Sequence, residues 1–272
     1  MNSNSFSVVM PTFDRDDLFF LFDDAVNSCL LSTLLPDEII IIVDGPVRPE
    51  FVSKIEHFER LNSVKVLWLP ENVGLTKALN EGLKHVTSRY VFRADGDDIN
   101  RPNRFALQLD MLSQGYSLCG GAICEKDMQG NLLAVKRCPS DHEDILNYAR
   151  RRNPFNHMSV AYELKAAIAV GGYPDIYLKE DWGLWALLIE AGAKTINSQE
   201  IFVDATADIN MYRRRGGVKN IISEYFIQKF LVSHLGKSIF SAFTDFFIKM
   251  LFFFTPTQMR GFIIRRYFRY SS

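Results

Sequence analysis

Short apolar segments alternate with longer amphipathic segments over the first hundred residues, and this order limits the possible folds. Apolar runs lie at 6–10, 38–43, 64–69 and 89–93. Segments with helical spacing of apolar residues lie between them, at 17–32, 50–61 and 75–86. The run at 38–43 has almost no polar alternation, so we expect both of its faces to be covered. The pattern predicts an α/β protein with a mostly parallel sheet and helices on both sides.

Beyond residue 101 the alternation is less regular. We predict helices at 103–112, 142–150 and 180–191, and strands at 117–124 and 132–137. This order favours a mixed sheet in the second half of the domain. The first strand is expected to end at Pro11, because proline lacks the N–H group that a central strand uses.

The net charge of −1 hides two chemically different parts. Up to Asn210 the chain has 20 basic and 30 acidic residues, and after it 11 basic and 2 acidic residues. Half of the 22 phenylalanines also lie in the last 62 positions. We therefore divide the chain into a domain at 1–212 and a basic, Phe-rich helical appendage at 213–272.

One segment of the appendage, 238–254, has apolar residues at helical spacing. They are Ile239, Phe240, Phe243, Phe246, Phe247, Met250, Leu251 and Phe254, opposite Ser241, Thr244, Asp245 and Lys249. The segment is shorter than a membrane-spanning helix. The following residues include Arg260, Arg265, Arg266 and Arg269 and no acidic residue. This composition favours helices that lie on an anionic membrane surface, or that pack on the main domain or on a second subunit.

The four cysteines, Cys29, Cys119, Cys124 and Cys138, have no metal-binding spacing. They are expected to be small buried residues in a reducing compartment. The N-terminal residues do not match a secretory signal, so we expect a cytoplasmic protein.

Three carboxylates are crowded in Asp95-Gly96-Asp97-Asp98, directly after the fourth predicted strand. Asp44 ends another strand at the same sheet edge, where ligands bind in parallel α/β sheets. Carboxylate oxygens suit Mg²⁺ or Mn²⁺. A solvated acidic turn is the alternative.

The loop after the first strand, Pro11-Thr12-Phe13-Asp14-Arg15, contains no glycine. Sugar-nucleotide pyrophosphorylases carry a Gly-rich basic loop at this position, so this class of enzyme is excluded. The chain also lacks the G-x-G-x-x-G and G-x-x-x-x-G-K motifs at this turn, which excludes dinucleotide enzymes and phosphate-loop NTPases.

Further motifs occur in a fixed order along the chain. They are Val8-Val9-Met10-Pro11-Thr12-Phe13, Ile42-Val43-Asp44-Gly45, Asn72-Val73-Gly74-Leu75, Arg93-Ala94-Asp95-Gly96-Asp97-Asp98, Asn153-Pro154-Phe155-Asn156-His157, Gly171-Gly172-Tyr173, Glu180-Asp181-Trp182 and Arg213-Arg214-Arg215-Gly216-Gly217. Together they resemble the family 2 glycosyltransferases of the GT-A fold, a Rossmann-like architecture, and within them the bacterial enzymes of O-antigen, capsule and exopolysaccharide synthesis. The resemblance runs from Phe6 to about Gly217.

The resemblance implies a nucleotide-sugar site. Pro11, Thr12 and Asp44 would hold uracil, Asp95 would contact ribose or metal, and Asp97 would bind Mn²⁺ or Mg²⁺. Asn72, Arg93 and Arg215 would also lie on the donor side. Arg213 to Arg215 could instead meet lipid headgroups. Many family members have two acidic residues where this chain has Val43-Asp44, so base recognition would rest on Asp44 alone.

The resemblance also implies an inverting reaction, with Asp181 as the general base for the acceptor hydroxyl. Glu180, Trp182 and His157 would lie on the acceptor side, with Trp182 offering a face for sugar stacking. Glu180-Asp181 could equally be an acidic first helical turn, and His157 could be a structural histidine.

The resemblance implies transfer of a hexose or N-acetylhexosamine from a nucleotide sugar, with a UDP sugar as the expected donor, to a polyprenyl-diphosphate-linked saccharide. We expect a peripheral protein at the inner face of the plasma membrane, a possible homodimer, and no nucleic-acid partner. The alternative is a non-catalytic scaffold that binds nucleotide sugars.

Overall fold

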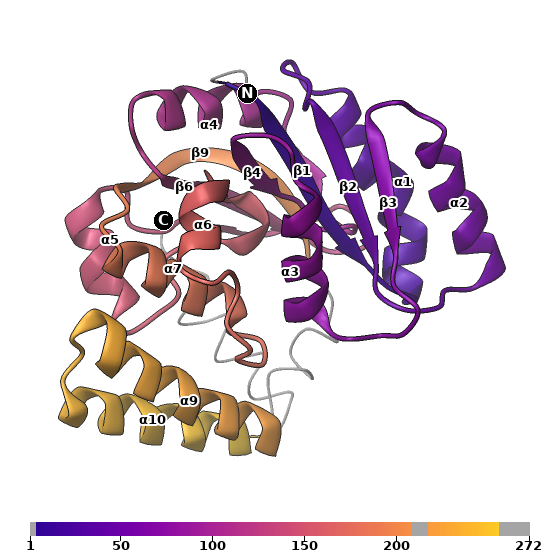
Figure 1. Cartoon of the computed structure of the whole chain (residues 1–272). Coiled ribbons are helices and arrows are strands. Elements are labelled where there is room, and N and C mark those ends of the chain that lie inside the picture. The colour runs from indigo at the N-terminus through magenta and orange to yellow at the C-terminus, as the bar shows by residue number, and fades with distance from the viewer. Residues whose placement is uncertain (1–3, 208–216, 256–272) are drawn as a thin grey trace.

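A computed structural model describes residues 4–207 and 217–255, and its core is one mixed sheet (Figure 1). The strand order is β3-β2-β1-β4-β8-β6-β9-β5, with β7 paired to β6. The strands are β1 (Phe6–Thr12), β2 (Glu38–Val43), β3 (Val64–Trp68), β4 (Tyr90–Arg93), β5 (Ile99–Asn100), β6 (Leu118–Lys126), β7 (Leu132–Lys136), β8 (Ala161–Glu163) and β9 (Thr195–Thr206).

Helices cover both faces of the sheet, as the unbroken apolar strand predicts. The first helices are α1 (Asp16–Leu30), α2 (Pro49–Glu59), α3 (Leu75–His85), α4 (Arg104–Ser113) and α5 (His142–Ala149). They are followed by α6 (Leu164–Ala169), α7 (Glu180–Glu190), α9 (Val218–Leu235) and α10 (Ile239–Phe254). Side chains of α1, α2 and α4 form the core on one face, and those of α3, α5, α6, α7 and α9 form the core on the other.

The first four strands follow the predicted pattern. β1 lies parallel to both β2 and β4, and β2 lies parallel to β3. The prediction that β1 ends at Pro11 was wrong, because the strand continues to Thr12. Pairing with β4 already ends at Val9, opposite Arg93, so Pro11 is paired only with β2, opposite Ile42. The proline therefore interrupts no two-sided ladder.

The second half contains the predicted mixed topology and a strand that the sequence did not indicate. β9 lies parallel to β6 and antiparallel to β5, with register shifts near Ala122. Its polar residue Asn197 is buried and donates hydrogen bonds to the carbonyls of Pro139 and Pro154. Such a segment lacks strand periodicity, so only its partners identify it.

The four cysteines are buried and free, in agreement with their expected structural role. In the described part of the chain, no helix has the length and hydropathy needed to cross a membrane.

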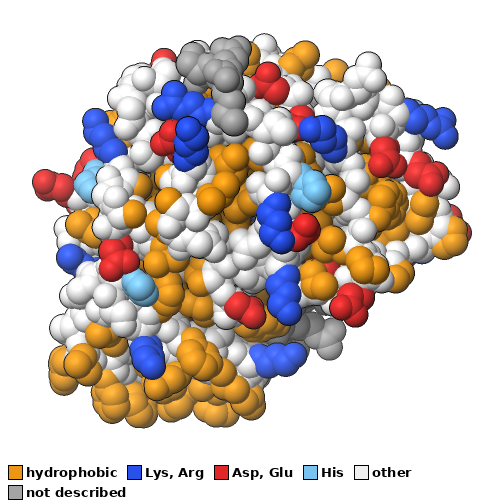
Figure 2. Space-filling view, in the orientation of Figure 1, with side chains coloured by type: hydrophobic (Ala, Val, Ile, Leu, Met, Phe, Trp, Pro, Cys, Tyr) orange, Lys and Arg blue, Asp and Glu red, His pale blue; other side chains and the backbone are white. Residues whose placement is uncertain are grey.

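The two tail helices lie side by side next to α7 (Figure 1). α10 has the predicted apolar stripe, and much of it faces outward: Phe240 is 78% exposed and Phe243 is 60% exposed. Its polar residues face inward, where Asp245 is buried and pairs with Lys237 at 2.7 Å. The distribution of polar and apolar side chains is therefore the reverse of that in an ordinary surface helix. Figure 2 shows hydrophobic side chains gathered along the edge that these helices form.

Candidate active site

The candidate site lies where β1, β2 and β4 end at one edge of the sheet. Because these strands are parallel, the loops after Thr12, Val43 and Arg93 emerge on the same side. The acidic segment Asp95–Asp98 follows β4 directly. The N-terminus of α7 carries Glu180 and Asp181, and His157 connects Asp181 to the acidic segment.

Asp95 is held by two basic side chains. Arg93 Nε donates to Oδ1 at 3.0 Å, and His157 Nε2 lies 3.1 Å from Oδ2. Burial alone would raise the pKa of Asp95, but Arg93 and His157 outweigh it and hold the pKa well below its usual range. Asp95 is therefore ionised.

The negative charge of Asp97 is offset by fewer basic side chains than that of Asp95. Arg15 Nη2 donates to its Oδ2 at 2.6 Å, while burial and Asp95 raise its pKa to about 6. The neighbouring Asp98 has a pKa raised well above its usual range by burial and by Asp97 and Asp95, and its Oδ1 accepts the Thr206 N–H at 2.9 Å. The crowding makes this segment short of positive charge, which a bound cation would supply.

Asp181 is buried at the start of α7, where it accepts two hydrogen bonds and lies close to His157. Its Oδ1 accepts the Trp182 N–H at 2.7 Å, and its Oδ2 accepts Asn153 Nδ2 at 2.7 Å and lies 3.5 Å from His157 Nδ1. Burial would raise the pKa of Asp181, but His157 and Arg93 outweigh it and lower the pKa. Burial and Asp181 raise the pKa of Glu180 to about 7. The two adjacent acids thus differ: Asp181 is ionised at neutral pH and held by three contacts, whereas Glu180 is partly protonated.

His157 lies between the two parts of the site. Burial opposes its charge, but Asp95 and Asp181 raise its pKa to about 9. The imidazolium therefore links the acidic segment to α7, and its side chain is still 39% exposed. Sequence reasoning gave either an acceptor contact or a structural role, and the observed contacts join two predicted site carboxylates.

On the predicted base-binding side, Asp44 directly follows β2 and is buried. Its two carboxylate oxygens accept the N–H groups of Val73 and Gly74 at 2.7 and 3.0 Å, and Asn72 Nδ2 donates to its carbonyl at 3.0 Å. Asp44 thereby fixes the loop that leads into α3. Any contact with a base must use its remaining lone pairs.

Thr12 lies at the end of β1 beside the acidic segment. A Cβ placed on Gly96 would be 3.6 Å from Thr12 Oγ1. This hydroxyl is buried and has no hydrogen-bond partner among the residues that the structure describes. Pro11 precedes it and is partly buried. The two residues therefore adjoin the predicted donor site.

Trp182 does not offer the predicted stacking face. Its side chain is 4% exposed, and its Nε1 donates to the Ala149 carbonyl at 2.9 Å. Lys249 Nζ lies 4.8 Å from the ring centre. The stacking prediction is corrected, because Trp182 of α7 packs in the core against α5 and α10.

Arg93 is also buried, with 2% exposure. It pairs with Asp95 and so lies behind the acidic segment. A direct contact of Arg93 with the donor, which the resemblance implied, does not fit this position. Arg215, together with Arg213 and Arg214, lies outside the described residues.

Three site residues were not singled out from the sequence. Arg15 pairs with Asp97, Asn153 donates to Asp181, and Thr206 Oγ1 donates to the Asp97 carbonyl at 2.7 Å. Arg15 is in the loop after the first strand, and Asn153 begins one of the recognised motifs. The position of each residue in the sequence could therefore have identified it as part of the site. Thr206 had no such signal, because its strand was not predicted.

Comparisons with known proteins identify the family of the chain. The glycosyl transferase family 2 matches residues 7–172. A UDP-Gal:alpha-D-GlcNAc-diphosphoundecaprenol beta-1,3-galactosyltransferase from Escherichia coli is 35% identical over 271 residues, which cover 97% of this chain and 96% of the relative. The amylovoran biosynthesis glycosyltransferase AmsE from Erwinia amylovora is 33% identical and is covered to 82%, with 80% of this chain aligned. The chain belongs to glycosyl transferase family 2, and the resemblance seen in its motifs is confirmed.

Solved structures support the fold. The structure of Staphylococcus aureus TarS 1-349 in complex with UDP-GlcNAc has a TM-score of 0.61 at 16% identity, over 88% of this chain and 75% of that chain. At this identity the likeness concerns architecture, and it confirms the GT-A type of fold.

Proposed function

We propose that this glycosyltransferase transfers a hexose or N-acetylhexosamine from a UDP sugar to a saccharide on a polyprenyl diphosphate, with inversion at the anomeric carbon. The observation that carries the proposal is the juxtaposition of a buried, ionised Asp181 with the Asp95–Asp98 segment, joined through His157. The similarity to a galactosyltransferase whose acceptor is GlcNAc-diphosphoundecaprenol supports the choice of donor and acceptor class.

Asp181 is assigned as the general base. Its lowered pKa keeps it ionised at neutral pH, and Asn153 and the Trp182 N–H fix its orientation. In the proposed step, the acceptor hydroxyl passes its proton to Asp181 while its oxygen forms a bond to the anomeric carbon. The bond from that carbon to the diphosphate breaks, and UDP leaves with the electron pair. A single displacement needs one base and inverts the configuration.

The donor set at Asp97 fits Mn²⁺ or Mg²⁺ held largely by the substrate. Both oxygens of Asp95 are engaged, and the described residues contain no cluster of three or more ligating side chains. Mg²⁺ is commonly bound through one or two carboxylates and substrate phosphates, which suits Asp97 and its raised pKa. Asp97, with Asp95 beside it, would hold the ion, which would stabilise the charge of the leaving diphosphate.

The remaining donor contacts are assigned to the ends of β1 and β2. Pro11, which is only partly buried, would contact the uracil. Thr12, whose hydroxyl is buried, would shape the site together with Asp44 and Asn72. Arg93 would act on the donor through Asp95.

The donor and acceptor can be tested together. UDP-Gal, UDP-Glc, UDP-GlcNAc and UDP-GalNAc are incubated with Mn²⁺ and a synthetic lipid bearing GlcNAc on a diphosphate, and UDP release is measured. We expect release with at least one donor, UDP-Gal first, only when the lipid acceptor is present. Donor hydrolysis without dependence on any acceptor, or no release with any donor, would contradict the proposal.

We also propose that the outward apolar face of α10 rests on an anionic bilayer at the inner face of the plasma membrane. The face presents the exposed side chains of Phe240, Phe243 and Phe247. The charged residues of the helix, Asp245 and Lys249, form ion pairs on its opposite, inward side. The sequence after Thr255 adds four arginines and no acidic residue, which suits anionic headgroups. Because the sequence after α10 is basic and has no acidic residue, an anionic bilayer is favoured over a second copy of the chain as the partner of this face.

Replacing Phe240, Phe243 and Phe247 together by serine should abolish co-flotation with phosphatidylglycerol-containing vesicles. Each phenylalanine contributes roughly 2 kcal/mol when buried, so the loss of all three should lower partitioning by about ten-thousandfold. Phe20→Ser on α1, where the side chain is 66% exposed, is the matched control and should float like wild type. Equal flotation of the triple variant would refute the membrane face. Sedimentation equilibrium of the same proteins tests the dimer.

A further inference from the structure

The turn that leads into α7 has an unfavourable backbone conformation. Leu178 has a φ of 56°, and in the described residues it is the one non-glycine position with a positive φ. A side chain in this region costs conformational free energy, and it persists when surrounding contacts hold the backbone. Leu178 is three residues before Asp181. The position of the proposed base therefore depends on whatever holds this turn.

The contacts that hold the turn come from α9. Ser223 Oγ donates a hydrogen bond to the Tyr177 carbonyl, just before Leu178. Glu224 Oε2 lies 3.2 Å from Lys179 Nζ, just after it. Two consecutive residues of one helix thus fix the residues on both sides of the strained position. Both Ser223 and Glu224 are almost completely buried.

Glu224 connects this turn to the tail helix. Its Oε1 accepts Lys249 Nζ of α10 at 2.8 Å and Gln228 Nε2 at 2.6 Å. Lys249 also lies over the ring of Trp182, the residue after Asp181. One buried carboxylate therefore separates two lysines, one from the turn and one from the tail. Without its charge these lysines would repel each other.

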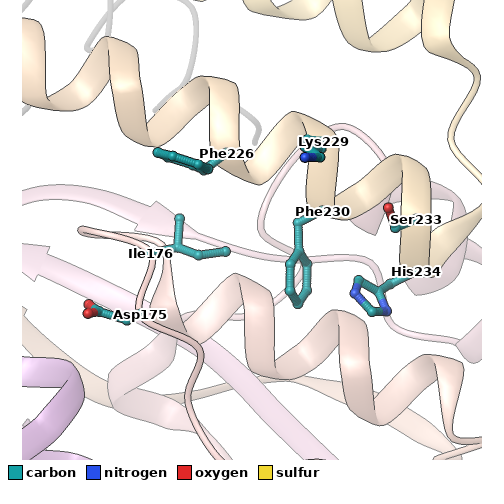
Figure 3. Close-up of a pocket in the computed structure, with 7 residues that line it drawn as sticks. All are labelled: Asp175, Ile176, Phe226, Lys229, Phe230, Ser233 and His234. Carbon is teal, nitrogen blue, oxygen red and sulfur yellow. The ribbon is translucent and has the colours of Figure 1, made fainter.

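The middle of α9 gives the turn less support. A pocket of about 310 Å³ lies between α9 and the loop residues Asp175 and Ile176. Figure 3 shows Phe226, Phe230 and His234 lining it on the helix side. None of the carboxylates of the candidate active site lines it. Space separates the helix from the loop here, so the polar contacts of α9 with the turn are those of Ser223 and Glu224, together with the Lys219 ammonium over the Tyr177 ring.

We propose that Ser223 and Glu224 are positioning residues for the catalytic base: they hold the turn at 177–179, and through it Asp181, in the geometry needed for proton transfer. The tail is then part of the catalytic apparatus as well as a surface for the membrane. This inference rests on the proposed role of Asp181. It adds that residues far along the chain, which touch neither donor nor acceptor, determine the rate of the transfer step.

The test compares Glu224→Gln and Ser223→Ala with Glu190→Gln in the full chain. Glu190 pairs with His234 at 2.7 Å, so it also joins α7 to α9, but at the end of α7 away from Asp181. We expect Glu224→Gln to lower kcat by about ten- to a hundredfold, because small displacements of a catalytic group have effects of this size. Ser223→Ala should lower kcat less. The Kd for UDP and the donor KM should stay within about twofold.

A second measurement does not depend on activity. Amide hydrogen exchange over 177–182 should be faster in Glu224→Gln than in wild type or Glu190→Gln. Adding Leu178→Gly removes the backbone penalty, so the double variant should regain at least part of the lost kcat and protection. A merely structural role of Glu224 would not be rescued at this one position.

The inference is overturned if Glu224→Gln matches Glu190→Gln in both kcat and exchange, or if Leu178→Gly restores neither. If wild type shows no sugar transfer, the proposed function fails, whereas exchange at 177–182 still decides whether Glu224 holds the turn. If Asp181→Asn retains transfer while Glu224→Gln alters exchange, the turn is held but Asp181 is not the base, and the positioning role is rejected.

Discussion

Asp181→Asn is expected to lower kcat for sugar transfer by about a thousandfold or more, with the affinity for UDP unchanged. General base catalysis contributes roughly 10²–10⁴-fold, and asparagine cannot accept the hydroxyl proton. The substitution keeps the shape of the side chain, and its one amide oxygen can still accept the Trp182 N–H at the start of α7, although the NH2 group in place of Oδ2 cannot accept from Asn153. Single-turnover transfer and isothermal titration with UDP measure the two quantities separately.

Two variants distinguish this effect from a general loss of charge. Asp175→Asn makes the same chemical change at an exposed position of the preceding loop and should leave transfer unaffected. Glu180→Gln should retain transfer within about tenfold, because the pKa of Glu180 is raised to about 7 and about half of the side chains are already protonated at neutral pH. If Glu180→Gln abolished transfer and Asp181→Asn did not, the base would have to be reassigned to Glu180.

Asp97→Asn is expected to lower transfer by about a thousandfold and, in the absence of metal, to raise the free energy of unfolding. The loss of activity follows if Asp97 holds the cation that stabilises the leaving diphosphate, a contribution of several kcal/mol. The gain in stability follows from removing a carboxylate that burial and Asp95 disfavour. Arg15 keeps a partner in the variant, because it also pairs with Asp17.

The stability gained in Asp97→Asn depends on pH through the pKa of Asp97. The pKa of Asp97 is about 6 in the folded chain and lower in the unfolded chain, so between these values the folded chain binds the extra proton. The carboxylate therefore destabilises the folded chain at pH 7, and this penalty disappears as the pH falls below the unfolded pKa. The advantage of Asp97→Asn, on the order of 1 kcal/mol at pH 7, should vanish near pH 4.

Urea denaturation at several pH values, in EDTA, measures this difference. Asp127→Asn is the control of opposite sign, because hydrogen bonds from Asn131 lower the pKa of Asp127, and its loss should not stabilise the chain. A destabilised Asp97→Asn at pH 7 without metal would mean that Arg15 already compensates the carboxylate. Full activity in this variant would remove Asp97 from the proposed metal site.

Much of the fold could be predicted because burial leaves a periodic signal. The Ile-rich run of β2 indicated a strand covered on both sides, and the turn after β4 indicated an acidic sheet edge. β9 could not be predicted, because its buried Asn197 is satisfied by carbonyls distant in the sequence. Polar residues in such a strand carry no periodicity until their partners are known.

The candidate site divides in the same way. Residue types and motif order identified Asp95, Asp97 and Asp181, which carry the chemistry. They did not reveal that His157 contacts both Asp95 and Asp181, nor that Trp182 is enclosed by α5 and α10. These features depend on which surfaces meet, and a single sequence does not specify them.

The tail helix α10 shows most directly what a single sequence leaves undetermined. Helical spacing in the sequence determined that Phe240, Phe243 and Phe247 share one side of α10 and that Asp245 and Lys249 lie opposite. Only the tertiary structure decided which side is packed. Because Glu224 and Lys237 supply buried partners of opposite charge, the polar side faces the protein and the phenylalanines face outward. Periodicity gives the faces of a helix, whereas the side that is buried depends on the groups that meet it.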